Sequence, residues 1–239
     1  MKRFFPIMYE DTDKGMHFAL FAYWIFAFWL MPFWMPILAQ GLWNKLGVIS
    51  WFEMVYHAIN GVVIALILKG YLQESFFNVQ TDVKKFFKIV VGSALVMLAL
   101  AFVAGLYFGG VIFDFYPLCE MSVAFTPGYL VQNQPIFGTI CCSVFSPFAI
   151  VGLFYAAGFA PVCRRHRWLG YVVVAVVMAL PCAFDILWRG EAVFVILSYL
   201  VQLPLHWVAC WTYQNADTVW APIATLFLFN FGTSLMTLM

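Results

Sequence analysis

Long apolar stretches separated by short polar segments dominate the pattern of this chain. Seven runs are long enough to cross a bilayer, because about 20 mostly apolar residues in a helix span its hydrocarbon core. They cover residues 16–39, 48–69, 87–108, 137–161, 168–188, 192–211 and 219–238. The pattern predicts an all-α polytopic membrane bundle of seven transmembrane helices, forming one integral membrane domain over 1–239. The connection 109–136 has room for an eighth or re-entrant helix.

Composition agrees with this class and narrows the partners. The 239 residues are 65% hydrophobic and only 10% charged, which excludes an ordinary soluble domain. The net charge of +1 gives no reason to expect nucleic-acid binding. We therefore expect membrane lipid as a partner, with a membrane protein or peptide as a further candidate and no nucleic acid.

The placement of basic residues predicts the orientation. If the spans alternate, all of the twelve Lys and Arg residues except Lys45 and Arg189 lie on one side. Basic connections stay in the cytoplasm, so the N-terminus is predicted inside and the C-terminus outside. The mixed polar segment 70–88 predicts a short amphipathic helix on the inner surface, with Phe76 and Phe77 dipping into the membrane.

The second run carries three polar residues on one helical face. Glu53, His57 and Asn60 are spaced four and three apart. Ionisable groups within a membrane usually face a bundle interior or a wet cavity, which makes Glu53 and His57 candidate functional residues. Alternatively, Glu53 lies near the outer surface and is solvated, while His57 and Asn60 bond neighbouring backbone.

The stretch from Tyr213 to Asn230 predicts a helix entered through a defined turn. A polar segment, 214–218, leads into Trp220-Ala-Pro222 and a long apolar run. Proline suits the first turn of a helix, where its missing N–H is not needed, and tryptophan suits the membrane boundary. Asn230 is the one strong polar group deep in the run.

This stretch resembles the last core segment of the CPBP family, the CAAX-protease and bacteriocin-processing membrane proteins (also called Abi or type II CAAX prenyl endopeptidase-like). In that family Trp-Ala-Pro-Ile is followed, after two residues, by His-x-x-x-Asn/Asp. The same count puts Leu226 at the His position and Asn230 at the Asn position. The resemblance covers about residues 70–232, most clearly 145–165 and 213–230. It implies a CPBP-like region over 70–239, with its core at about 137–238, and leaves 1–69 as two additional N-terminal helices.

The other family motifs align on earlier helices. Ser146-Pro147 through Tyr155 fits the frame of the Glu-Glu-x-x-x-Arg motif, with Ile150 and Val151 at the glutamates and Tyr155 at the arginine. The Phe-x-x-x-His motif then places Asp185 at its histidine. A second register instead aligns the segment 184–190 with the glutamate motif and makes His206 the histidine. It leaves too few residues between motifs for a span and a return, so we prefer the first register.

The resemblance implies a fold whose active members cleave peptide bonds in or beside the membrane. Apolar side chains at the two glutamate positions cannot act as the general base that activates water. We therefore expect a non-catalytic pseudo-protease that binds a peptide, lipid or membrane-protein partner in its intramembrane cavity, without cofactor or metal. The family resemblance and the short connections favour a bacterial plasma membrane, with the endoplasmic reticulum as the alternative.

Two other function classes stay open. One is an active endopeptidase with a rebuilt site formed by Asp185, His206 and Asn230, joined by Glu53 and His57. The other is a small transporter component, which is disfavoured because the spans show few midplane charges and no obvious inverted repeats.

Overall fold

The computed structural model describes residues 14–26, 49–113, 135–163, 166–189 and 192–238. Within these ranges the chain is almost wholly helical and contains no β-strand, which confirms the predicted all-α class. Each predicted apolar run contains a described helix. The principal helices are α1 (Lys14–Ile25), α3 (Ile49–Ile67), α4 (Lys69–Thr81), α5 (Val83–Phe113), α11 (Leu169–Arg189), α12 (Ala192–Ala216) and α13 (Trp220–Leu238).

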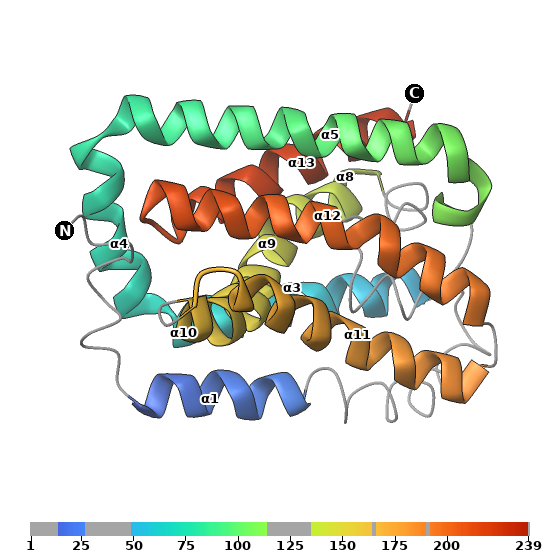
Figure 1. Ribbon diagram of the computed structural model, residues 1–239, viewed down its shortest axis with the longest axis horizontal. Helices are drawn as coiled ribbons and strands as arrows, with labels where there is room; N and C mark the ends of the chain where they lie inside the picture. Colours follow the sequence, from blue (N-terminus) through green and yellow to red (C-terminus); the bar gives the residue numbers. More distant parts are fainter. Residues whose placement is uncertain (1–13, 27–48, 114–134, 164–165, 190–191, 239) are drawn as a thin grey trace.

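A further, interior helix runs without interruption over residues 135–163, and we call it the central helix. It consists of α8 (Pro135–Ile140), η3 (Cys141–Phe145), α9 (Ser146–Ile150), η4 (Val151–Phe159) and α10 (Ala160–Cys163). Of its apolar window 56% is buried, compared with 22% for that of α5. The central helix is therefore enclosed by the others, whereas α5 lies along one edge of the bundle (Figure 1).

Three described helices are long and apolar enough to cross a membrane: Val83–Ala104, Pro135–Cys163 and Val195–Ala216. A fourth is added if Ala58–Ile67 and Lys69–Thr81, which meet at a bend of 78°, form one broken span. Shorter apolar stretches occupy Leu169–Leu180 and Trp220–Met236. The predicted total of seven or eight spans stays a prediction, and most of the connection 109–136 lies outside the described residues.

The outer faces of the bundle are apolar, as expected for helices that contact lipid. Large hydrophobic side chains stand exposed on the edge helices, among them Leu95 and Phe102 on α5 and Val193 and Leu200 on α12. Soluble monomers rarely expose large apolar side chains over a contiguous surface. The observed exposure supports the membrane assignment independently of helix length.

Two glycines let the central helix approach α3 closely. A Cβ built on Gly61 would lie 2.5 Å from the carbonyl oxygen of Phe145 and 2.8 Å from its Cα. A Cβ on Gly152 would lie 2.2 Å from Cγ2 of Ile64, a fully buried side chain. Only a residue without a Cβ fits at either contact.

Helix α4 crosses one end of the bundle (Figure 1). Phe76 and Phe77 are exposed on it while Ser75 is buried, so a helix forms where the sequence predicted one, with aromatic side chains on an open face. Its placement on the inner membrane surface stays a prediction, because the same helix could form half of a broken span.

A set of hydrogen bonds fastens α4 to the turn between α12 and α13, and we call it the α4 clasp. The Ser75 and Thr218 hydroxyls lie 2.8 Å apart, and Ser75 Oγ accepts a 3.0 Å bond from the backbone N–H of Val219. Asn78 donates to the carbonyl of Asp217 at 2.7 Å. Trp220 Nε1 donates to the carbonyl of Leu72 at 2.8 Å. The turn that opens the last helix is therefore fixed by α4, and α13 begins at Trp220 as predicted.

Candidate functional site

The central helix departs from α-helical geometry where the family motif was expected. In η3 the backbone N–H of Ser146 donates to the carbonyl of Cys141, five residues back, and in η4 that of Ala160 donates to Tyr155 in the same way. Hydrogen bonds from a backbone N–H to the carbonyl five residues earlier define a π-turn, a form that is rare and is often found at functional sites. The residue after Ser146 is Pro147, which has no backbone N–H to continue the ladder.

Asn230 supplies a donor at this interruption. Its Nδ2 donates a 2.7 Å hydrogen bond to the carbonyl of Cys142, and the side chain is fully buried. In an α-helix the Cys142 carbonyl would accept a hydrogen bond from the N–H of Ser146, but that N–H is directed to Cys141. In a continued π-turn the donor would be the N–H of Pro147, and proline has no backbone N–H. Asn230 therefore has a structural role in this chain, bridging α13 to the central helix.

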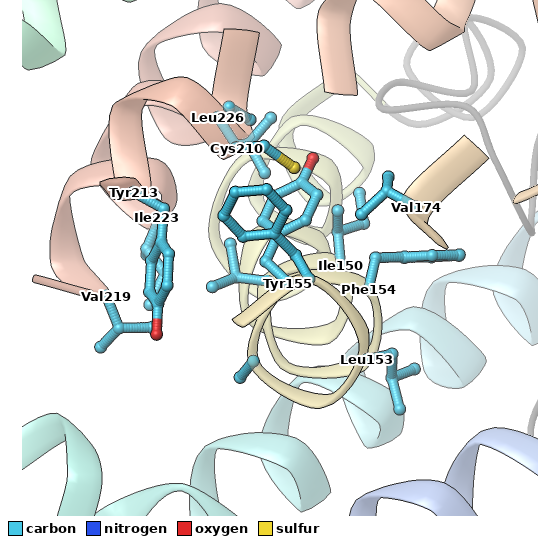
Figure 2. Packing of buried hydrophobic residues seen from close by; sticks show 14 of the residues in the cluster. Ile150, Leu153, Phe154, Tyr155, Val174, Cys210, Tyr213, Val219, Ile223 and Leu226 are labelled. Atoms are coloured by element: carbon cyan, nitrogen blue, oxygen red, sulfur yellow. The ribbon is translucent and has the colours of Figure 1, made fainter. Parts of the chain in front are cut away.

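Four of the positions that the resemblance aligned with catalytic side chains lie in the hydrophobic core. Val151, Tyr155 and Leu226 are fully buried, Ile150 nearly so, and all four belong to one packed cluster. Figure 2 shows Ile150 and Tyr155 on the central helix, with Cys210 from α12 and Leu226 from α13 close by. Neither glutamate position carries a group that could accept a proton from water.

Tyr155 forms a polar contact within this cluster. Its hydroxyl lies 2.8 Å from Nδ1 of His206, which is fully buried on α12. The rings of Phe154 and Tyr155 meet the imidazole edge-on, with centroids 5.7 and 5.9 Å away. A buried histidine between two aromatic rings, bonded to a tyrosine, is a satisfied polar group that ties α12 to the central helix.

The alternative site is only partly within the described residues. His206 and Asn230 are described, and they bond to different turns of the central helix, Tyr155 and Cys142. The backbones of Asp185, Glu53 and His57 lie in α11 and α3, but their side chains are outside the described residues, so their expected convergence stays untested. Among the described side chains, no three His, Cys, Asp or Glu residues are grouped as metal ligands would be.

A groove with a volume of about 1030 Å³ lies between α5, α11 and α12, away from the family-equivalent positions. Most of its surface is apolar or aromatic, from Val96 and Leu100 on α5, Pro204, Trp207 and Trp211 on α12, and Trp168. Sequence reasoning missed this groove, because its walls come from runs distant in the chain. The signals that are visible in the sequence are a lone Ser93 within an aliphatic helix and a lysine, Lys88, just over one turn earlier.

Two polar groups of this groove are already bonded within the protein. Trp207 Nε1 donates to the carbonyl of Tyr171 at 3.2 Å, and the Tyr171 hydroxyl donates to Oε1 of Gln214 at 3.0 Å. The Ser93 hydroxyl differs from them. It is buried, at 3% exposure, and finds no hydrogen-bond partner among the described residues.

No protein-family model matches the chain, and neither a curated protein nor a solved structure shows significant similarity to it.

Proposed function

We propose that this protein is a non-catalytic membrane protein that binds a lipid in the groove between α5, α11 and α12. The groove carries this proposal, because it is large, mostly apolar and bounded by helices that could face the bilayer. Its volume of about 1030 Å³ lies at the upper end of ligand pockets in general, about 300–1,000 Å³. A lipid chain is the apolar ligand that every membrane helix meets.

Two observations support the absence of catalysis. The side chains at the glutamate positions, Ile150 and Val151, are apolar and packed in the core. His206 and Asn230, two buried polar residues of the neighbouring helices α12 and α13, each hold a hydrogen bond to the central helix. Activation of water for peptide hydrolysis needs a positioned base, and the described histidine beside these positions, His206, is fully buried and held by Tyr155.

The proposal also covers the family relationship and the membrane topology of the chain. We infer a degenerate relative of the CPBP family with seven spans, its N-terminus in the cytoplasm and its C-terminus outside, in a bacterial plasma membrane. The motifs around Ser146-Pro147 and Trp220-Ala-Pro222 support the relationship, and the distribution of lysine and arginine supports the orientation.

A blocking substitution tests the groove directly. A Cβ on Gly92, which lines the groove, would meet nothing within 4 Å, and the same holds for Gly70 on α4 outside it. Gly92→Phe should therefore fill the groove without disturbing the bundle, and Gly70→Phe is the matched control. Both variants would be purified in mild detergent, and bound lipid would be measured by native mass spectrometry.

We expect Gly70→Phe to retain the lipid bound by the natural chain and Gly92→Phe to lose it. Equal retention by both variants would show that the groove is not the binding site. Cleavage of membrane peptides by the purified protein, abolished by Asp185→Asn, would overturn the non-catalytic assignment in favour of the rebuilt site.

A further inference from the structure

The groove has a charged end. Of the described residues that line it, Lys88 alone carries a charge, and its side chain is exposed. Lys84 lies one helical turn before it, and Arg167 lies beside the lining residue Trp168. No carboxylate is among the described lining residues. This end therefore favours an anionic group.

Trp168, which lines the groove together with Lys88, indicates a membrane boundary at the same end. Trp168, just before α11, is 67% exposed. Indole rings gather at the headgroup level of a bilayer, where an apolar body and a polar N–H are both accommodated. Lys88 and Trp168 thus sit where a lipid headgroup would lie, and the aliphatic wall of Val96 and Leu100 continues towards the hydrocarbon.

Ser93 adds a polar group part-way along this wall. Five residues of α-helix separate it from Lys88, which is a rise of about 7.5 Å at 1.5 Å per residue. Its hydroxyl is buried and without a partner among the described residues, a costly arrangement that a hydrogen-bonding ligand would relieve. The groove therefore fits a ligand with an anion at one end, a hydrogen-bond acceptor a few ångströms deeper and an apolar chain beyond.

We propose that the lipid in this groove is an anionic glycerophospholipid. Its phosphate lies at Lys88, an acyl ester carbonyl accepts the hydrogen bond of Ser93, and the acyl chain runs along Val96 and Leu100. This inference rests on the proposed lipid-binding function and specifies its ligand. An isoprenyl phosphate offers the anion and the chain but no carbonyl. A zwitterionic lipid carries an extra cation beside Lys88.

The test compares four probes on the full-length protein in lipid nanodiscs or detergent. They are diacyl phosphatidylglycerol, diacyl phosphatidylcholine, the dialkyl ether form of phosphatidylglycerol and farnesyl phosphate. Binding would be measured as the fraction of lipid-bound protein by native mass spectrometry. We expect diacyl phosphatidylglycerol to bind best, by about tenfold over phosphatidylcholine, because the choline cation of phosphatidylcholine is repelled by Lys88.

Two variants separate the contributions. Lys88→Gln should remove the preference for phosphatidylglycerol over phosphatidylcholine, whereas Lys84→Gln, on the same helix outside the groove, should keep it. Ser93→Ala should weaken binding of the diacyl lipid several-fold and leave the ether lipid unchanged, because the ether lacks the carbonyl.

Three outcomes would overturn this assignment. An unchanged preference in Lys88→Gln would remove the headgroup site, and an equal loss of diacyl and ether lipids in Ser93→Ala would remove the ester contact. Tighter binding of farnesyl phosphate than of phosphatidylglycerol would point to an isoprenoid ligand. In each case, loss of all lipid from Gly92→Phe would leave the proposed lipid-binding function standing.

Discussion

The contact between Asn230 and the central helix gives a prediction that can be worked through in detail. Replacing Asn230 with leucine removes the amide that donates to the carbonyl of Cys142. This carbonyl lies at the π-turn where Pro147 provides no N–H. Loss of a donor to a buried carbonyl costs about 1–3 kcal/mol. Leucine recovers part of this by burying apolar surface, so we expect a net loss of about 1–2 kcal/mol.

A second substitution, combined with the first in a double-mutant cycle, restores a backbone donor. Pro147→Ala places an N–H five residues after Cys142, in the same pattern as the bond from Ser146 to Cys141. In that background the backbone can serve the Cys142 carbonyl, and Asn230→Leu should cost about 1 kcal/mol less than in the natural chain. The coupling between the two substitutions is the quantity that tests the reasoning.

Stability would be measured as the midpoint of unfolding in SDS–detergent mixtures, with helix content and size-exclusion profile as readouts. Thr233→Val is the control on the same helix, because the Thr233 hydroxyl bonds to carbonyls of its own helix, those of Phe229 and Asn230 at 3.1 Å. We expect this control to change stability little. Equal costs of Asn230→Leu in the natural chain and in the Pro147→Ala background would refute the role assigned to the asparagine.

Three further substitutions test the packing and hydrogen bonds of the bundle. Gly61→Ala should destabilise the protein by about 1–3 kcal/mol, because the added Cβ overpacks the contact with Phe145. Gly70→Ala should stabilise it by about 0.5–1 kcal/mol, because a Cβ there meets nothing and alanine favours the helix. Thermal midpoints in detergent that shift in the same direction for both variants would contradict this. Ser75→Ala should cost about 1–2 kcal/mol by breaking the α4 clasp, and limited proteolysis should then cut α4 faster. Tyr155→Phe should lower stability by about 1–2 kcal/mol through its lost bond to His206 and leave lipid binding unchanged, which native mass spectrometry checks.

The sequence predicts the helices of this fold well because each helix is encoded by residues that are close together in the chain. The apolar runs mark their extent, and Trp220 with Pro222 marks the start of α13, as the structure confirms. The span count is harder to predict. Apolar length does not reveal the 78° bend between the Ala58–Ile67 and Lys69–Thr81 helices, nor that the central helix would be enclosed while α5 lies at an edge.

The candidate site illustrates a different limit. The sequence assigned Tyr155 and His206 to separate registers, yet the structure places their side chains in one hydrogen bond across 51 positions. Their meeting depends on how α12 packs against the central helix, which no local pattern encodes. The same is true of Ser93, which lines a groove built with α11 and α12.

The α4 clasp has a consequence for the order in which the protein is assembled. Ser75 and Thr218 are separated by 143 positions, so their contact cannot form until the turn after α12 has been made. Until then α4 lies at the bundle surface without its partners, and contacts between such distant segments form late. A ribosome-released chain ending within α12 would lack the turn that fastens α4. Synthesis of the turn after α12 is thus the step that allows α4 to be fastened.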